Sequence, residues 1–219
     1  MLSFNALANP LAPEWDLIVG ADTGTYMSAV ICAVPPGDFA QIVCLAEVPN
    51  YRYVSNEIEL LGMSVPEWAR IVYGMLKKLR PGTEHFNLWA DPNTQFRAEL
   101  QHYGLNLLGN LRGPELRCEI TREYMQSTDP VRLHLAPWLS VLPYEIEHAK
   151  WPEDTTSAGK FMRIKHHDHT LDPLEHCCSR RPRSEEILNE RKKSFLEQQL
   201  EQMGRFDRTH HSDPHLGRL

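Results

Sequence analysis

Short apolar runs rich in β-branched residues predict three strands in the first part of the chain. Residues 16–21 form a compact apolar run, which is typical of a strand buried on both faces. A second strand is expected over 26–34 and, after a Pro-Pro-Gly-Asp turn, a third over 39–48. Because short hairpin-like connections join the three strands, we expect them to be antiparallel, with Asp22 at the end of the first.

The pattern then changes to a helical period over residues 65–79. The apolar positions of this segment share one helical face and are Val65, Trp68, Ala69, Val72, Met75, Leu76 and Leu79. Ser64 has the chemistry of an N-cap, Pro66 fits the first turn, and Glu67 complements the helix dipole. A Pro-Gly pair shortly after the last apolar position ends the predicted helix.

The remaining segments alternate between strand and helix patterns. Further strands are expected over 85–90, 105–108, 131–135 and 161–164. Further helices are expected over 94–103, between 117 and 130, over 138–148 and over 169–179. An antiparallel group followed by alternating helices and strands predicts an α/β fold with a sheet of mixed direction.

The length of 219 residues suits one domain with extensions better than two full domains. Residues 1–14 have the composition of a leader with little to bury, and 15–183 form the predicted domain. In the C-terminal extension, 184–219, apolar residues recur at helical spacing over 184–203 and the remaining tail is polar. With 42% hydrophobic and 24% charged residues, the chain is globular rather than disordered or fibrous.

Net charge, cysteine content and the length of the apolar stretches each limit the class of protein. The 23 Lys and Arg residues against 29 Asp and Glu give a net charge of −6, without the basic character of many nucleic-acid-binding proteins. A negative net charge is weak evidence against nucleic-acid binding by a metal enzyme, because its carboxylates belong to the metal site. Five cysteines without paired spacing indicate reduced thiols in a cytoplasm. No apolar stretch approaches the roughly 20 residues that span a bilayer, so we expect an intracellular protein without a membrane partner.

Three aspartates occupy positions where an acidic metal site is expected. Asp22 and Asp91 each end an apolar strand, and Asp172 lies early in a helix after a His-His-Asp-His segment. Strand ends of an open α/β sheet lie together, and sites form there. Hard divalent cations such as Mg²⁺ and Mn²⁺ bind carboxylate oxygens, and two ions about 3.5–4 Å apart support an in-line displacement. Each aspartate taken alone is equally well explained as a turn former or a helix-start charge.

Four segments carry a more specific pattern, and together they resemble the nuclease domain of viral (tailed-phage) large terminases. They are W-D-L-I-V-G-A-D-T-G-T-Y at 15–26, L-W-A-D-P at 88–92, L-H-L-A-P at 133–137 with the segment 142–151, and H-D-H-T-L-D-P-L-E-H at 167–176. The first two are similar to the family's acidic metal-binding strands, the third to the segment leading to a helix rich in Glu and Tyr, and the last to its D-H-x-x-D helix start. The resemblance implies an RNase H-like mixed sheet flanked by helices, here with a C-terminal helical extension.

The same resemblance implies a two-metal endonuclease that cuts concatemers of viral DNA during genome packaging in the host-cell cytoplasm. By position, Asp22 would bridge two Mg²⁺ or Mn²⁺ ions, Asp91 would hold one of them and Asp172 the other. Such ions activate the attacking water and stabilise the leaving oxygen.

Three residues around the last motif refine this expectation. His169 precedes Asp172 by three positions and therefore shares its helical face, so it would lie beside the ions as a catalytic residue. Asp168 is the alternative third ligand in place of Asp172. Pro173 departs from the small residue usual after the last aspartate of the family, a departure that the first turn of a helix tolerates.

Basic side chains around the acidic centre are expected to hold DNA phosphates, with strong salt dependence. The candidates are Arg112, Arg117, Arg122, Lys160, Arg163, Lys165, Arg180, Arg181 and Arg183, of which those from 160 onward are favoured. The implied partners are double-stranded DNA, an ATPase motor, the portal protein and the small terminase subunit. The chain has no G-x-x-x-x-G-K-[ST] motif, so the nuclease is either the C-terminal half of a longer protein or a separate gene product. The helix at 184–203 either packs on the nuclease body or docks a partner.

Other functions remain open at this point. A RuvC-like junction resolvase, or another RNase H-like nuclease, would prefer four-way junctions, and a non-catalytic packaging adaptor would keep the fold without binding metal. Zinc is a further candidate because of His166, His167, His169, His176, Cys177 and Cys178. Zinc sites prefer four ligands in spaced pairs, however, and no second pair is evident. Cys177 and Cys178 are therefore expected in the core.

Overall fold

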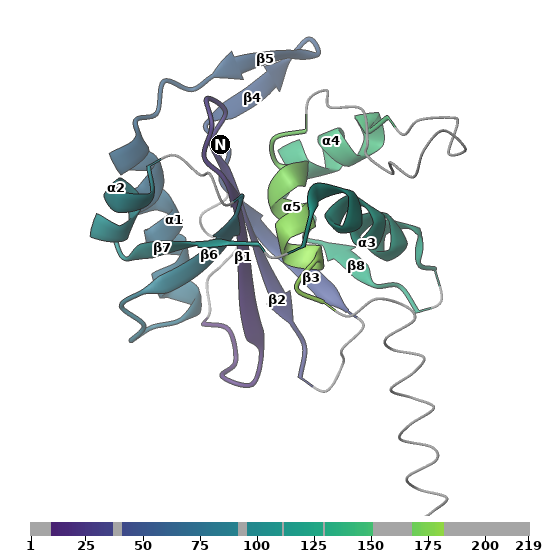
Figure 1. The fold of residues 1–219 in the computed structure, drawn as a ribbon, viewed down its shortest axis with the longest axis horizontal. Coiled ribbons are helices and arrows are strands. Elements are labelled where there is room, and N and C mark those ends of the chain that lie inside the picture. The colour runs from purple at the N-terminus through teal and green to yellow at the C-terminus, as the bar shows by residue number, and fades with distance from the viewer. Residues whose placement is uncertain are drawn as a thin grey trace, which may run out of the picture. The chain divides into compact units, whose positions relative to one another are not determined.

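The computed structural model describes residues 10–36, 41–91, 96–110, 112–128, 130–150 and 168–181, within a compact unit that spans residues 1–181. Among these residues, six strands form one mixed sheet in the order β7-β6-β1-β2-β3-β8 (Figure 1). The strands are β1 (Asp16–Asp22), β2 (Ser28–Val34), β3 (Ile42–Glu47), β6 (Phe86–Ala90), β7 (Leu105–Gly109) and β8 (Leu133–Leu135). The predicted α/β fold with a sheet of mixed direction is confirmed.

The strand directions place several strand ends at one edge of the sheet. Strand β2 pairs antiparallel with both β1 and β3, as predicted. Strand β6 runs parallel to β1 and to β7, and β8 runs parallel to β3. The C-terminal ends of β1 and β6 therefore lie side by side.

Helices pack on both faces of this sheet (Figure 1). They are α1 (Val65–Leu79), α2 (Arg97–His102), α3 (Pro114–Gln126), α4 (Val141–His148) and α5 (Leu171–Cys178). One core, which includes Trp68 and Leu76, joins α1 and α2 to the sheet. A second core, which includes Leu142 and Leu174, joins α3, α4 and α5 to the opposite face. Every residue of β2 is buried because helices cover both of its faces.

Helix α1 matches its sequence-based prediction from the first residue to the last. The Ser64 hydroxyl accepts a hydrogen bond from the Glu67 N–H (3.4 Å), and the Glu67 carboxylate accepts one from the Ser64 N–H (2.9 Å), which together form a capping box. Six of the seven apolar residues predicted on its inner face are buried, and Val65 packs against the same core. The amphipathic pattern thus determines which side of the helix meets the sheet.

A short hairpin that the sequence analysis missed follows β3. It consists of β4 (Tyr51–Val54) and β5 (Glu57–Leu60), which pair antiparallel with each other. Ser55 and Asn56 form its two-residue turn, and both have positive φ values, as a type I′ turn requires. Neither is glycine, so the usual Asn-Gly or Asp-Gly signal for this turn is missing from the sequence.

Several predicted segments differ from the structure or lie outside the described residues. Leu11, in the predicted leader, packs against the core, and its N–H donates to the Leu79 carbonyl (3.0 Å). The strand expected over 161–164 and the helix expected over 184–203 lie outside the described residues. Within the described part of the chain, no helix has the length and apolar character that crossing a bilayer requires.

Candidate metal centre

Asp22 and Asp91 lie level with each other at the edge where β1 and β6 end. Gly20 pairs with Trp89 in the parallel register, and each aspartate follows two residues later on its own strand. Residues two apart on a strand share a face, and neighbouring strands lie about 4.8 Å apart. The side chains remain accessible, since that of Asp22 is 29% exposed and that of Asp91 is 60% exposed.

Helix α5 brings Asp172 to the same edge through an unusually close contact with β1. A Cβ atom at Gly20 would overlap the backbone carbonyl of Pro173, so only glycine allows this approach. Pro173 is the neighbour of Asp172, and Gly20 lies two residues before Asp22. The contact therefore fixes Asp172 close to the end of β1.

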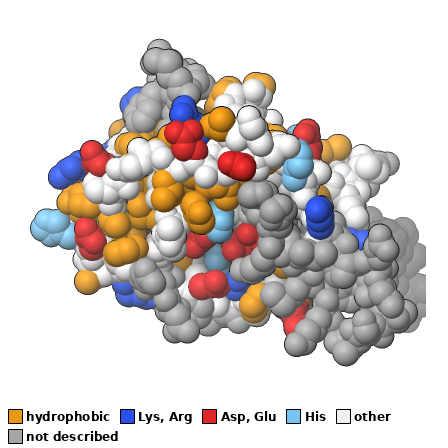
Figure 2. All heavy atoms as spheres, turned by 90° about the horizontal axis from the view of Figure 1, so that it is seen from above, with side chains coloured by type: hydrophobic (Ala, Val, Ile, Leu, Met, Phe, Trp, Pro, Cys, Tyr) orange, Lys and Arg blue, Asp and Glu red, His pale blue; other side chains and the backbone are white. Residues whose placement is uncertain are grey.

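The electrostatic surroundings of His176 link all three aspartates. Burial, followed by the charge of the Arg117 guanidinium, lowers the pKa of His176 to about 4, although Asp91, Asp172 and Asp22 oppose both effects. The His176 Nε2 atom lies 3.7 Å from Asp91 Oδ1, and its Nδ1 atom accepts from the Asn110 amide (3.3 Å). His176 is therefore a neutral, buried group whose pKa all three carboxylates affect. Viewed from above, acidic side chains gather around histidines near the middle of the molecule (Figure 2).

Arg117 is the most direct partner of Asp91. Arg117 lies on α3 with its side chain buried, and its guanidinium donates to Asp91 Oδ1 at 2.8 Å and to the Arg112 carbonyl at 3.2 Å. The prediction that Arg117 holds a DNA phosphate is therefore wrong, because its charge is used inside the protein. It fixes the position of Asp91 instead.

His169 lies beside Asp22. Its Nδ1 atom is 3.6 Å from Asp22 Oδ2, and its ring stacks on Tyr26 with 4.5 Å between the centroids. Burial by itself lowers the pKa of His169, but the hydrogen bond and the charge of Asp22 outweigh it, and Asp168 and Glu145 add to the rise. The net effect is a pKa above the ordinary value, with Asp22 as the main cause of the rise.

Asp168 and Asp172 face different surroundings, which separates the two candidates for the third acid. Asp172 acts on the pKa of His176 together with Asp22 and Asp91, whereas Asp168 acts on that of His169. Asp168 is buried, and Asp172 is half-buried. These surroundings are a reason to prefer Asp172 as the third acid, and the choice between the two residues stays a prediction.

A buried glutamate that the sequence analysis did not single out holds the start of α5. Glu145 on α4 is 1% exposed, and its Oε2 atom accepts from the backbone N–H groups of Thr170 (2.7 Å) and Leu171 (2.8 Å). Its Oε1 atom accepts from the hydroxyls of Tyr51 (2.7 Å) and Tyr53 (2.8 Å). Glu145 thus supplies the cap that the first turn of α5 lacks locally, and it fixes the helix that carries Asp172. Burial is the main cause that raises its pKa to about 7.

Helix α4 is itself held by another buried glutamate, Glu47 at the end of β3. The Glu47 carboxylate accepts from the N–H groups of Ser140 (2.6 Å), Val141 (2.8 Å) and Leu142 (2.7 Å). Carboxylates at helix N-termini are favourable because they pair with free N–H groups and with the helix dipole. Two glutamates therefore connect the sheet to α4 and α4 to α5.

The carboxylates do not form a closed ligand cage. Among the described residues, no three His, Cys, Asp or Glu side chains are grouped so as to hold a metal ion. Asp91 forms an ion pair with Arg117, and Asp22 lies beside the His169 ring, so both acids already have side-chain partners. The site is an open edge with three acids of different exposure.

The structure describes some of the predicted DNA-contacting and zinc-related residues and not others. Lys160, Arg163 and Lys165, with His166 and His167, lie outside the described residues. Arg180 is exposed and stacks over the Trp89 ring at 3.9 Å, close to Asp91. Arg181 is 8% exposed, and its place at a DNA-binding surface stays a prediction. Cys177 and Cys178 are fully buried, which confirms their prediction as core residues.

No protein-family model matches the chain, and no curated protein matches it in sequence. Solved structures do match its fold. The g2p large terminase nuclease domain of bacteriophage SPP1, solved with bound Mn, has a TM-score of 0.50 and 14% identity, over 75% of this chain and 86% of that one. The large terminase nuclease of thermophilic phage G20c has a TM-score of 0.52 and 12% identity, over 80% and 87%.

A third match is a longer protein. The large terminase of another thermophilic bacteriophage, in complex with ATP-γ-S, has a TM-score of 0.50 and 16% identity, and the match covers 76% of this chain and 40% of that one. At such identities a likeness shows the fold. The chain therefore has the RNase H-like fold of large terminase nuclease domains, as the sequence motifs implied.

Proposed function

We propose that this chain is a metal-dependent DNA endonuclease that cuts concatemeric viral DNA during genome packaging. The observation that supports it is that Asp22 at the end of β1, Asp91 directly after β6 and Asp172 early in α5 all affect the pKa of the buried His176. Turn formation or helix capping explains any one aspartate, but neither explains why three from separate segments affect one buried histidine. The fold shared with terminase nuclease domains directs the proposal to viral DNA.

The three aspartates have the chemistry of a site for Mg²⁺ or Mn²⁺. Carboxylate oxygens are the ligands that these hard cations prefer, and an open edge leaves room for water and a phosphate. The SPP1 nuclease domain was solved with bound Mn, which favours the same class of ion here. Two bound ions would polarise the attacking water and stabilise the departing 3′ oxygen.

Each side chain has a distinct role in this proposal. Asp22 ends β1, the strand that pairs with β6 and contacts α5, and it would bridge the two ions, with Asp91 and Asp172 holding one each. His169, whose Nδ1 atom lies 3.6 Å from Asp22 Oδ2, would orient the attacking water. Arg117 and Glu145 are positioning residues, since they act through Asp91 and through the first turn of α5.

Substrate and partners follow from the same comparison. Arg180, exposed above Trp89 beside Asp91, is the described residue that we assign to a DNA phosphate, and Lys160, Arg163 and Lys165 stay as proposed contacts. The large terminase solved with ATP-γ-S binds an ATP analogue and is much longer than this chain, so an ATPase motor is the first proposed partner. The portal protein and the small terminase subunit are further proposed partners, and the host-cell cytoplasm is the proposed location.

A plasmid-nicking assay with a matched pair of variants tests the proposal. Asp22→Asn removes a proposed ligand at the end of β1, and Asp16→Asn makes the same change at the exposed start of that strand. With Mn²⁺, Asp22→Asn should nick supercoiled DNA about 10³-fold more slowly than wild type, because a lost ligand removes several kcal/mol of charge stabilisation. Asp16→Asn should cut at the wild-type rate.

Two outcomes would contradict the proposal. One is the absence of nicking by wild-type protein with both Mg²⁺ and Mn²⁺, which would favour a non-catalytic adaptor. The other is equal nicking by Asp22→Asn and wild type, which would attribute the activity to a contaminant or to another site. Cleavage of linear duplex at least as fast as a four-way junction separates the proposed packaging nuclease from a junction resolvase.

A further inference from the structure

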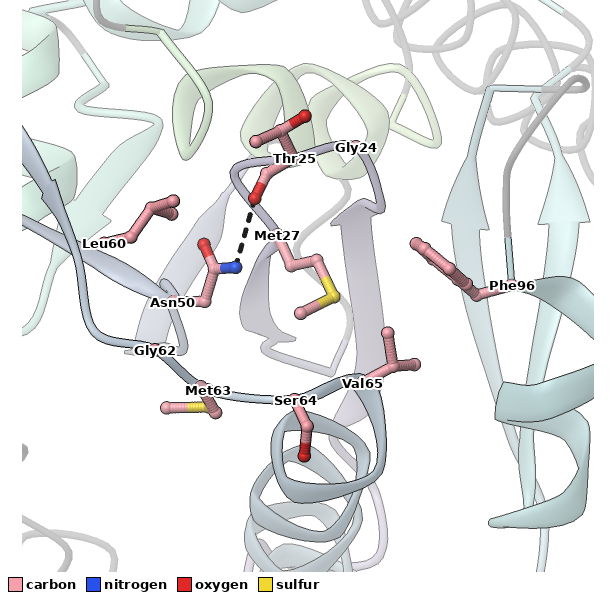
Figure 3. Close-up of a pocket in the computed structure, with 10 residues that line it drawn as sticks. All are labelled: Gly24, Thr25, Met27, Asn50, Leu60, Gly62, Met63, Ser64, Val65 and Phe96. Carbon is pink, nitrogen blue, oxygen red and sulfur yellow. Dashed lines mark hydrogen bonds between the residues drawn. The ribbon is translucent and has the colours of Figure 1, made fainter.

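A pocket of about 280 Å³ lies beside the turn that follows Asp22 (Figure 3). Its lining comes from three places: this turn, the β4–β5 hairpin with the segment after it, and the start of α2. The lining includes Thr25, Met27, Asn50, Leu60, Met63 and Phe96. The volume is near the lower end of the range of roughly 300–1,000 Å³ for ligand pockets, so the guest must be small.

The walls of the pocket favour a flat, aromatic guest. Met27 and Met63 present flexible thioethers, which adapt to a ring and contact it favourably. Phe96 is exposed at the rim and has a φ of 61°, a left-handed conformation that is unfavourable for a bulky residue. Such backbone strain is concentrated at functional sites. An exposed aromatic ring in a fixed position is a surface on which another ring stacks.

Asn50 holds one wall of the pocket in place. Its side chain is buried, with 4% of the residue exposed, and its Nδ2 atom donates to the Thr25 carbonyl at 3.2 Å (Figure 3). This bond connects the segment before β4 to the turn after Asp22. Asn50 therefore acts on a guest through the position of that turn.

The position of the pocket connects its guest to the acidic edge. The Gly24 N–H donates to Asp22 Oδ1 at 3.2 Å, and Gly24 and Thr25 also line the pocket. One short turn thus holds a proposed metal ligand on one side and forms a pocket wall on the other. A molecule with a phosphate at Asp22 has its neighbouring groups within reach of the pocket.

We propose that this pocket receives one unpaired nucleobase of the DNA strand that is cut at the Asp22 edge, an inference that rests on the proposed nuclease function. The base stacks against Phe96 and contacts the two methionines. Stacking of bases on aromatic side chains is independent of sequence, so the pocket tolerates any base.

Mapping of cut positions on DNA with a single abasic site tests this inference. A long duplex of fixed sequence, with the abasic site in one strand, is cut lightly with Mn²⁺, and the frequency of cutting is measured at every bond of that strand. The wild-type protein should cut about tenfold less often at one bond, at a fixed distance from the missing base, because the stacked base is absent there. The Phe96→Ala variant should cut that bond about as often as the neighbouring bonds of the same strand.

Matched variants provide the control. Leu60 lines the pocket and Leu61 does not, although the two have similar exposure. Leu60→Ala should reduce the depletion and Leu61→Ala should preserve it. A cutting profile that is flat around the abasic site in the wild-type protein would overturn the pocket assignment while leaving the nuclease intact. A depletion that Phe96→Ala and Leu60→Ala leave unchanged would overturn it as well. Failure to cut any DNA would instead refute the proposed function.

Discussion

Replacing Glu145 with glutamine exchanges a buried carboxyl group for a neutral amide of nearly the same size. Burial is the main reason that the pKa of Glu145 rises from 4.5 to about 7 in the folded protein. Between those two pH values the folded state binds more protons than the unfolded chain. The stability that the protonated carboxyl contributes is therefore fully present below about pH 4.5 and is lost as the pH rises to about 7.

The structure sets the size of the expected effect. A rise in pKa from 4.5 to about 7 corresponds to about 3 kcal/mol, since each pKa unit is worth about 1.36 kcal/mol. The glutamine variant has no proton to lose. The free energy of unfolding of the wild-type protein minus that of Glu145→Gln should therefore fall by about 3 kcal/mol between about pH 4.5 and about pH 7.5.

Urea unfolding followed by tryptophan fluorescence, at several pH values and constant ionic strength, measures this difference. Glu57→Gln, on the exposed hairpin strand β5, controls for the same chemical change at the surface. A difference that stays constant with pH, or grows as the pH rises, would refute the view that Glu145 is a buried carboxyl with a raised pKa.

Further variants test how the site is held. Gly20→Ala should destabilise the protein by about 3 kcal/mol, because a Cβ there overlaps the Pro173 carbonyl. Gly74→Ala in α1 meets open space and should stabilise the protein by about 0.5–1 kcal/mol. Thermal unfolding of the two variants measures this difference. Equal effects of the two changes would contradict the close contact between β1 and α5. Tyr51→Phe removes the hydroxyl that bonds Glu145 and Thr170, and should lower the free energy of unfolding by about 1–3 kcal/mol in urea titrations. No loss of stability would show that this hydrogen-bond network is not formed.

Much of the fold was predictable because local patterns and tertiary structure agree in it. The apolar run of β1 and the capping box of α1 depend on residues that are close in sequence, and both elements were predicted. The β4–β5 hairpin was not, because its turn residues Ser55 and Asn56 carry no glycine and its strands are only four residues long. Short strands with exposed positions give little periodicity to detect.

The aspartates of the site were also predictable, because each follows a recognisable strand or begins a recognisable helix. Their supporting residues were not. Arg117 looked like a surface cation of α3, and only the fold shows that it is buried against Asp91. Glu145 lies 25 residues before Thr170, and its role as a cap for α5 arises from tertiary packing, which no local spacing encodes.

The central claim is that Asp22, Asp91 and Asp172 share a pair of divalent ions. X-ray diffraction from crystals grown with Mn²⁺, measured at the manganese absorption edge, tests it most directly. We expect two anomalous peaks about 3.5–4 Å apart between these three carboxylates, with the Asp22 carboxylate contacting both. Ordered aspartates with no peak between them at saturating Mn²⁺, or peaks only at other residues, would contradict the claim.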